Sequence, residues 1–150
     1  MSKYTKQEQQ VINAGLKIIQ NKLCQENGLA LPVEMQKYLR LRLACDKDEW
    51  LCAMFMNNQY RMISFQRLFR GPVSVSIVML RVIARKALEL NAASVVLCQN
   101  HIAGDVVPRD EDRELTGKVK EALALFGIQL LDHIFVSRTD SYSLAEYELL

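Results

Sequence analysis

The chain has 150 residues, of which 50% are hydrophobic, and its 19 basic and 17 acidic residues give a formal net charge of +2. This composition fits one compact domain with its own core. The high apolar content excludes a disordered chain, and the presence of only 6 Gly and 3 Pro excludes a collagen-like or linker composition. The charge is too balanced to indicate binding to nucleic acid or to an anionic membrane by itself.

The sequence contains no apolar stretch that approaches the roughly 20 residues needed to span a bilayer. The N-terminal residues MSKYTKQEQQ are polar and lack the apolar segment of a signal peptide. The cysteines, Cys24, Cys45, Cys52 and Cys98, form no CxxC pair and have no zinc-finger spacing. We therefore expect a cytoplasmic protein without a membrane segment, whose cysteines are reduced.

The N-terminal part of the chain has helical periodicity. Apolar residues recur at three- and four-residue steps between Lys6 and Cys24, which predicts an amphipathic helix. Its apolar stripe consists of Val11, Ile12, Leu16, Ile19 and Leu23. Glu26-Asn27-Gly28 ends this helix, and a connector over residues 29–33, which contains Pro32, leads to a second helix over about residues 33–44. The expected buried face of the second helix holds Met35, Leu39 and Leu43.

After a solvated turn over residues 46–49, the pattern changes to one typical of strands. The apolar run from Trp50 to Met56 predicts a strand, and residues 57–59 predict a turn. Residues 60–69 predict the partner strand of a hairpin, because asparagine tolerates the left-handed backbone of a tight turn. Gly71-Pro72 ends this unit.

Helices and strands alternate in the rest of the chain. Residues 77–90 predict a helix, and residues 93–98 predict a wholly apolar strand of the kind buried on both faces of a sheet. The expected buried face of this helix holds Leu80, Ile83, Ala84, Ala87 and Leu88. Residues 99–109 predict a loop, and residues 110–126 a helix that ends at Gly127. The apolar face of that helix holds Leu115, Val119, Ala122, Leu123 and Phe126.

A strand over residues 128–136 and a last helical turn over residues 143–147 complete the predicted order. This order indicates a mixed α/β sandwich around one sheet. Gln99, Asn100 and His101 follow a buried strand, where such folds commonly place their sites. Asp112 lies in the first turn of the next predicted helix, so we expect it near His101.

Several blocks of the sequence resemble RadC-type proteins. The stretch from Ala92 to Asp105 is similar to the family's NAAxxILAHNHPSGD, and Pro108 with Asp112 is similar to TPSxxD. The other matching blocks are Leu68-Phe69-Arg70-Gly71 (LFxGT), Arg81 with Lys86-Ala87-Leu88 (PRE…KRAL), Leu130 to Val136 (LLDHIIVG) and Ser143-Leu144-Ala145-Glu146 (SFAE). The blocks agree in order and spacing over about residues 46–150.

The resemblance implies the α/β (α+β) class and the JAB/MPN fold, a cytidine-deaminase-like sandwich with a mixed central sheet flanked by helices. It implies this domain for residues 46–150, preceded by a helical N-terminal lead-in over residues 1–45. In the family, two histidines and an aspartate bind zinc, a glutamate takes a proton from the zinc-bound water, and a serine helps to hold the oxyanion.

Carried onto this sequence, the resemblance retains only two of the parts that this chemistry needs. His101 matches the second histidine and Asp112 the aspartate, so these are the two residual metal ligands. The first histidine is replaced by Gln99, the general-base glutamate by Gln66 and the serine by Arg109. An amide cannot accept the proton of the water, and an inward-pointing guanidinium would oppose a divalent cation. The resemblance therefore implies a retained scaffold with no working catalytic residues.

For several of these residues a structural role is the alternative to a functional one. His101 is either a residual metal ligand or a loop histidine bonded to the backbone or to Asp112. His133 lies on an apolar segment and is expected to be a satisfied core histidine. Gln66 and Gln99 are hypothesised to hydrogen-bond to each other across the vacant site, which would satisfy two buried amides.

Three functions follow as hypotheses. The first is a non-catalytic RadC-like domain, in a family labelled DNA repair, that binds a protein partner or a second copy of itself and needs no cofactor. The second is a metal-dependent hydrolase that holds zinc with a rearranged ligand set. The third is a nucleic-acid-associated protein. The candidate contacts to phosphate or to an acidic partner are Arg67, Arg70, Arg81 and Arg109.

Overall fold

A computed structural model describes residues 4–25, 32–43, 46–73, 76–102 and 105–150. Four helices and five strands lie within these ranges. The helices are α1 (Lys6–Gln25), α2 (Pro32–Leu43), α3 (Ile77–Glu89) and α4 (Asp110–Ala124). The strands are β1 (Trp50–Met56), β2 (Met62–Arg70), β3 (Ser94–Asn100), β4 (Gln129–Val136) and β5 (Ser141–Ser143). Within the described part of the chain, no helix is both long and apolar enough to cross a membrane.

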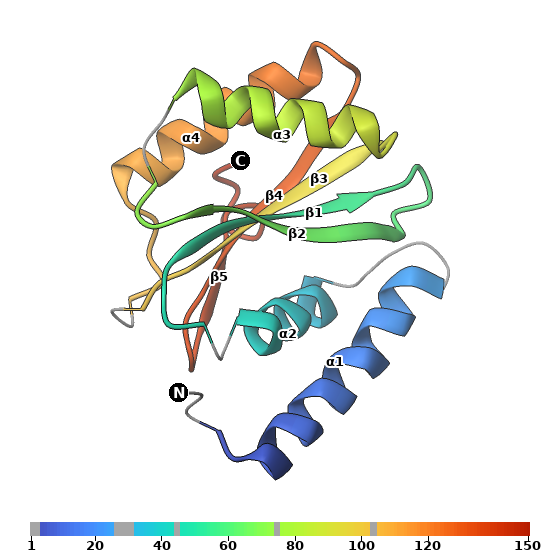
Figure 1. Cartoon of the computed structure of the whole chain (residues 1–150). Helices are drawn as coiled ribbons and strands as arrows, with labels where there is room; N and C mark the ends of the chain where they lie inside the picture. The colour runs from blue at the N-terminus through green and yellow to red at the C-terminus, as the bar shows by residue number, and fades with distance from the viewer. Residues whose placement is uncertain (1–3, 26–31, 44–45, 74–75, 103–104) are drawn as a thin grey trace.

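The strands form one mixed sheet in the order β2-β1-β3-β4-β5. The β3–β4 pair is parallel and the other pairs are antiparallel. Helices α3 and α4 lie over one face of this sheet, and α1 and α2 lie on the other side (Figure 1). The predicted fold class, an α+β sandwich with a mixed central sheet flanked by helices, is confirmed.

The sheet separates two hydrophobic cores, because successive side chains of a strand point to opposite faces. Leu51, Ala53 and Phe55 of β1 pack with α3 and α4, whereas Cys52, Met54 and Met56 pack with α2. Strand β3 alternates in the same way and is buried along its whole length. Both faces are covered, which explains why β1 and β3 are nearly continuous apolar runs in the sequence.

The two N-terminal helices differ in how much they contribute to the core. Helix α2 buries Met35, Leu39 and Leu43, as predicted, together with Tyr38. Pro32 is the first residue of this helix rather than part of a connector, which suits proline because the first helical N–H needs no partner. The predicted helix stop at residues 26–28 and the rest of the connector, residues 29–31, lie outside the described residues.

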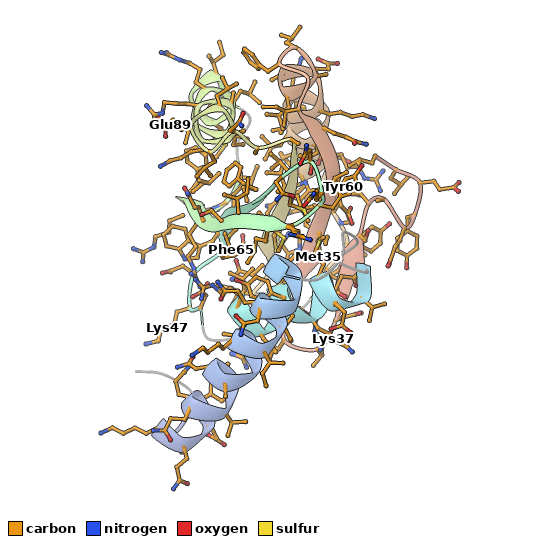
Figure 2. All side chains as sticks on the ribbon, turned by 90° about the vertical axis from the view of Figure 1, so that its right-hand side faces the viewer. Met35, Lys37, Lys47, Tyr60, Phe65 and Glu89 are labelled. Carbon is orange, nitrogen blue, oxygen red and sulfur yellow. The ribbon has the colours of Figure 1, made fainter. Side chains whose placement is uncertain are left out.

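Helix α1 extends away from the sheet and is largely exposed (Figures 1 and 2). Leu16 and Ile19 pack partly against the core on the α2 side, whereas Val11 is 72% exposed. The helix itself is confirmed, but its apolar stripe is only partly covered. The boundary at residue 45 stays a prediction, although α2 already packs on the sheet.

The hairpin between β1 and β2 begins its second strand later than predicted. Tyr60 belongs to the turn and has a φ of 58°, and β2 starts at Met62. The side chain of Asn57 organises this turn, since its Oδ1 accepts from the backbone N–H groups of Gln59 and Arg61. Asparagine commonly holds turns in this way.

Three further predictions about elements are wrong. Gln99 and Asn100 are the last residues of β3 rather than part of the loop that follows it. The segment that starts at Ser143 is not helical, because Ser141–Ser143 pairs with the edge of β4 and a turn follows. Leu88 and Phe126 were expected in the core but are 50% and 53% exposed. Leu88 follows the buried Ala87 and faces outward, and Phe126 lies beyond the end of α4.

A buried carboxylate attaches β5 and the turn after it to β4. Asp132 accepts hydrogen bonds from Ser143 Oγ at 2.5 Å and from the backbone N–H groups of His133 at 2.7 Å and Ala145 at 3.0 Å. Burial raises the pKa of Asp132, although these hydrogen bonds lower it. Because the charged form is poorly solvated there, each donor that faces it stabilises the C-terminal segment.

Replacing Ser143 with alanine is expected to lower the free energy of unfolding by about 1–3 kcal/mol, because one oxygen of buried Asp132 loses its donor. Urea unfolding followed by circular dichroism measures this loss. Ser141→Ala is the control, since Ser141 Oγ donates to the neutral Gln36 side chain and its loss should cost about 0.5–1.5 kcal/mol. Equal effects of the two substitutions would contradict the role given to Asp132.

Candidate functional site

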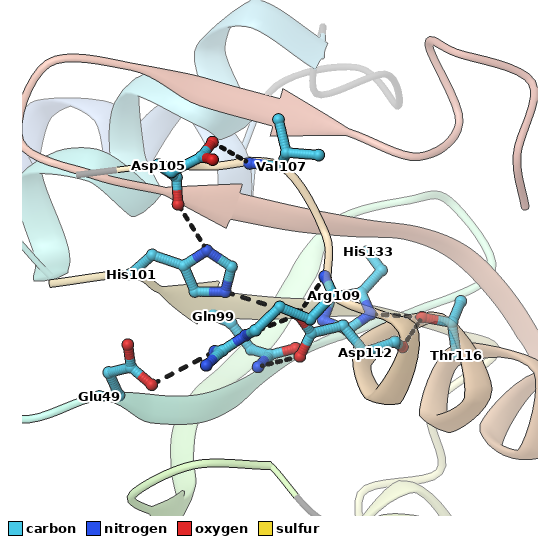
Figure 3. Close-up of polar contacts among 9 residues, drawn as sticks. All are labelled: Glu49, Gln99, His101, Asp105, Val107, Arg109, Asp112, Thr116 and His133. Atoms are coloured by element: carbon cyan, nitrogen blue, oxygen red, sulfur yellow. Dashed lines mark hydrogen bonds and ion pairs between the residues drawn. The ribbon is translucent and has the colours of Figure 1, made fainter. Parts of the chain in front are cut away.

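A cluster of polar side chains lies where β3 ends and α4 begins (Figure 3). Gln99 is the next-to-last residue of β3 and lies on the face covered by α3 and α4, and His101 directly follows this strand. Arg109 and Asp112 come from the N-terminal end of α4. Glu49 is the residue directly before β1. Because β1 and β3 are antiparallel, the start of β1 lies beside the end of β3.

Asp112 is the centre of this cluster. It is 1% exposed, and its Oδ1 accepts a hydrogen bond from Gln99 Nε2 at 3.0 Å. Its Oδ2 accepts from the backbone N–H of Arg109 at 2.8 Å and from Arg109 Nε at 3.3 Å. The bond to the backbone is a helix cap, because an acid in the first turn satisfies an N–H that has no partner within the helix. Both oxygens of the carboxylate are therefore engaged by groups of the chain itself.

His101 is buried and held through one ring nitrogen. Nδ1 lies 2.8 Å from the carbonyl oxygen of Asp105. A carbonyl oxygen only accepts, so Nδ1 carries a proton and donates it. Nε2 then lies 3.6 Å from Asp112 Oδ2, beyond hydrogen-bond range, and has no hydrogen-bond partner among the described residues. Of the two alternatives for His101, the backbone hydrogen bond of a loop histidine is present, and metal ligation stays a prediction.

Arg109 points into the cluster and connects two carboxylates. Its Nη2 lies 3.3 Å from Glu49 Oε2, and its Nε lies 3.3 Å from Asp112 Oδ2. Burial lowers the pKa of Arg109, but the two carboxylates outweigh this effect and raise it. The guanidinium is therefore a permanent positive charge between Asp112 and Glu49.

Glu49 is the residue of this cluster that sequence reasoning missed, and Gln66 is the residue that it placed there wrongly. Gln66 lies on β2, opposite Ala53 of β1, and its Nε2 donates to Ser64 Oγ at 3.2 Å. Only the antiparallel pairing of β1 with β3 brings Glu49 beside the cluster. One signal for Glu49 was present in the sequence: it is an acid directly before β1. The strand that pairs with β1 is β3, which leads into the candidate site.

The hypothesised hydrogen bond between Gln66 and Gln99 is also wrong. Gln99 donates to Asp112 and Gln66 donates to Ser64. Strand β1 separates β2 from β3, so the two backbones lie about two strand spacings, or roughly 9.6 Å, apart. Gln99 Oε1 is buried without a hydrogen-bond partner among the residues that the structure describes.

His133 lies beneath α4, close to the cluster. Thr116 Oγ1 donates to the backbone oxygen of Asp112 at 2.7 Å, so the 2.6 Å contact between Thr116 Oγ1 and His133 Nδ1 is a bond that the imidazole donates. Burial lowers the pKa of His133 to about 3. The prediction of a core histidine is confirmed, but only Nδ1 is satisfied, since Nε2 has no partner within the described ranges.

Three of the four arginines predicted to contact phosphate or an acidic partner are paired with carboxylates of the chain itself. Arg67 makes a two-pronged bond to Asp46, with distances of 3.0 and 3.2 Å, and Arg70 pairs with Asp48 at 2.7 Å. Arg109 is engaged by Asp112 and Glu49. Arg81 lies exposed on α3. Carboxylates of the chain thus neutralise three of the four.

The cluster does not fit the zinc site of the resemblance. A catalytic zinc needs three protein ligands and an open position for water. In the part of the chain that the structure describes, no group of three or more His, Cys, Asp or Glu side chains is placed to hold a metal ion. Asp112 is bonded to Arg109 and Gln99, and the guanidinium would repel a divalent cation.

The mixed sheet and the polar cluster at the end of β3 define an α+β domain of the JAB class. The profile of the RadC-like JAB domain matches residues 29–149, so the chain belongs to the RadC-like JAB domain family. The match begins before α2, in agreement with the packing of this helix on the sheet.

Relatives named "UPF0758 protein" are similar to this chain over most of its length. One from Vibrio cholerae is 36% identical over 139 residues, which cover 93% of this chain and 87% of the relative. One from Nitrosococcus oceani is 37% identical over 150 residues, which cover all of this chain and 66% of the relative. One from Pseudomonas savastanoi is 33% identical over 96% of this chain, which spans 64% of that relative.

Proposed function

We propose that this protein is a non-catalytic RadC-like JAB domain that acts by binding a protein partner or a second copy of itself. The observation that supports this proposal is the position of Arg109, whose guanidinium bonds to the same carboxylate that would ligate a metal. In this site, the single positive charge of Arg109 offsets part of the negative charge of Asp112 and Glu49. The protein therefore keeps the site folded without a metal ion.

The chemistry of the cluster agrees with this proposal. Hydrolysis by this class of site needs a metal that lowers the pKa of a bound water. A guanidinium is a hydrogen-bond donor that stays protonated, so it neither ligates water through a lone pair nor accepts a proton from it. Glu49 is a carboxylate, but its Oε2 is paired with Arg109 Nη2 at 3.3 Å, so the guanidinium and not a water occupies that oxygen.

Helix α1 supplies surface for a partner. Val11 and Ile18 are 72% and 61% exposed on a helix that contacts the rest of the protein mainly through other residues. Exposed apolar side chains on one element are typical of surfaces that another protein covers.

The proposal that the site is non-catalytic is tested by measuring zinc binding to the purified chain. Equilibrium dialysis is expected to show less than one zinc ion per wild-type chain. The double substitution Gln99→His with Arg109→Ser restores a second imidazole and removes the opposing charge, so it is expected to bind one zinc per chain. Gln66→His with Arg109→Ser is the matched control, because Gln66 lies outside the cluster and a histidine there should not restore binding.

A metal-dependent hydrolase is the second candidate, and two atoms favour it. His101 Nε2 and Gln99 Oε1 are both buried without a hydrogen-bond partner among the described residues. A cation that displaced Arg109 from Asp112 would find these lone pairs nearby. Stoichiometric zinc binding by the wild-type chain, abolished by His101→Ala, would establish this candidate and contradict the non-catalytic one.

A further inference from the structure

A second site lies beside the cluster but is built from other residues. A cavity of about 450 Å³ opens between α2, the end of β3 and the turn after β4. Its polar lining includes Arg40, His101, Ser137, Arg138 and Thr139. This volume is within the range of small-molecule sites, roughly 300–1,000 Å³. His101 is the residue that it shares with the Asp112 cluster.

Two arginines border this cavity without a partner of opposite charge. Among the residues that the structure describes, neither Arg40 nor Arg138 makes a hydrogen bond through its side chain or an ion pair. Arg40 is partly buried, and its Nε is fully shielded from solvent. A buried donor without an acceptor costs free energy, and the cost is larger for a charged group. These arginines therefore differ from Arg67, Arg70 and Arg109, which are paired within the chain.

The acids near the cavity do not cancel this positive charge. Asp46 borders the cavity, but both of its oxygens accept from Arg67, at 3.0 and 3.2 Å. Asp140 belongs to the same turn as Thr139 but is not among the residues that line the cavity, and it forms no ion pair with Arg40 or Arg138. Among the described residues that line the cavity, the one carboxylate, Asp46, is already paired with Arg67, so the charges of Arg40 and Arg138 have no carboxylate partner there.

We propose that this cavity binds a phosphate monoester. Such a group carries a charge of about −1.5 to −2 at pH 7 and three strong acceptor oxygens. Two guanidinium groups match this charge and can each donate two parallel hydrogen bonds to it. A carboxylate carries only one negative charge and would leave one arginine unbalanced. Thr139 also lines the cavity, and its hydroxyl is a further potential donor.

The proposal is tested by titrating the full chain with inorganic phosphate at constant ionic strength and following amide chemical shifts by NMR. The expected result is saturable binding with a dissociation constant of about 1 mM or tighter. Arg40→Gln and Arg138→Gln are each expected to weaken binding by at least about tenfold. Arg85→Gln is the matched control, since Arg85 lies on α3 and pairs with Glu89, and it should leave binding unchanged.

Two further arms identify the source of the phosphate. Adenosine monophosphate is compared with adenosine, and an oligonucleotide with a 5′-phosphate is compared with the same oligonucleotide without it. Binding that requires the terminal phosphate in either pair supports the proposal and shows which molecule supplies the group. Equal binding of the phosphorylated and unphosphorylated forms would overturn it, as would shifts that survive both arginine substitutions in variants whose thermal unfolding matches the wild type. Zinc binding is not involved, so this result is independent of the metal experiment.

Discussion

Replacing Asp112 with alanine is expected to lower the free energy of unfolding by about 1–3 kcal/mol for the buried Gln99 amide that loses its acceptor, and by about 0.5–2 kcal/mol more for the lost cap of α4. Asp112 is 1% exposed and accepts from Gln99 Nε2, from the Arg109 backbone and from Arg109 Nε. Its loss leaves the Gln99 amide buried without a partner and removes the cap of α4. Urea unfolding followed by circular dichroism measures the effect.

Glu111→Ala is the matched control for this experiment. Glu111 is also an acid in the first turn of α4, but it is exposed. Its replacement removes only a favourable interaction with the helix dipole, worth about 0.3–1 kcal/mol. If Asp112→Ala cost no more than Glu111→Ala, Asp112 would not be the centre of the cluster, and the account of Arg109 as its counter-ion would fail.

The protein is expected to lose roughly 2 kcal/mol of stability between pH 7 and pH 5 because of His133. Burial lowers the pKa of His133 to about 3, whereas an unfolded chain has a histidine pKa of about 6.5. Between these values the unfolded state binds a proton that the folded state does not. The contribution of His133 is therefore complete above about pH 6.5 and decreases as the pH falls towards 3. Urea unfolding at the two pH values measures the difference.

Two variants isolate this effect from the titration of other groups. His133→Asn is expected to be less stable at pH 7, but the part of the pH dependence due to the imidazole should disappear. His101→Asn removes the other histidine of the chain and should keep the His133 contribution. Two outcomes would show that His133 is protonated readily in the folded state. One is a wild-type free energy of unfolding that does not change between pH 7 and pH 5. The other is a pH dependence of that free energy that stays the same in His133→Asn.

The candidate site was only partly predictable, and the reason differs from residue to residue. His101 and Asp112 were found because they lie in one strand-loop-helix unit, within a short stretch of sequence. The sequence indicated that Arg109, if it pointed inward, would oppose a metal ion. The structure shows its Nε hydrogen-bonded to Asp112. Glu49 could not be found in the same way, because 50 residues separate it from Gln99 and only strand pairing joins their surroundings.

The amino-acid sequence by itself determined the elements whose pattern is local. The continuous apolar runs of β1 and β3 specify strands buried on both faces, and the helical periodicity specifies α1 to α4. Tertiary structure decided the features that depend on pairing between distant segments: the place of Glu49, the separation of Gln66 from the cluster, and the strand β5, which forms because it meets the edge of β4. Hydrophobic patterning shows which face of an element is buried, but neighbours across a sheet are set by strand order and register.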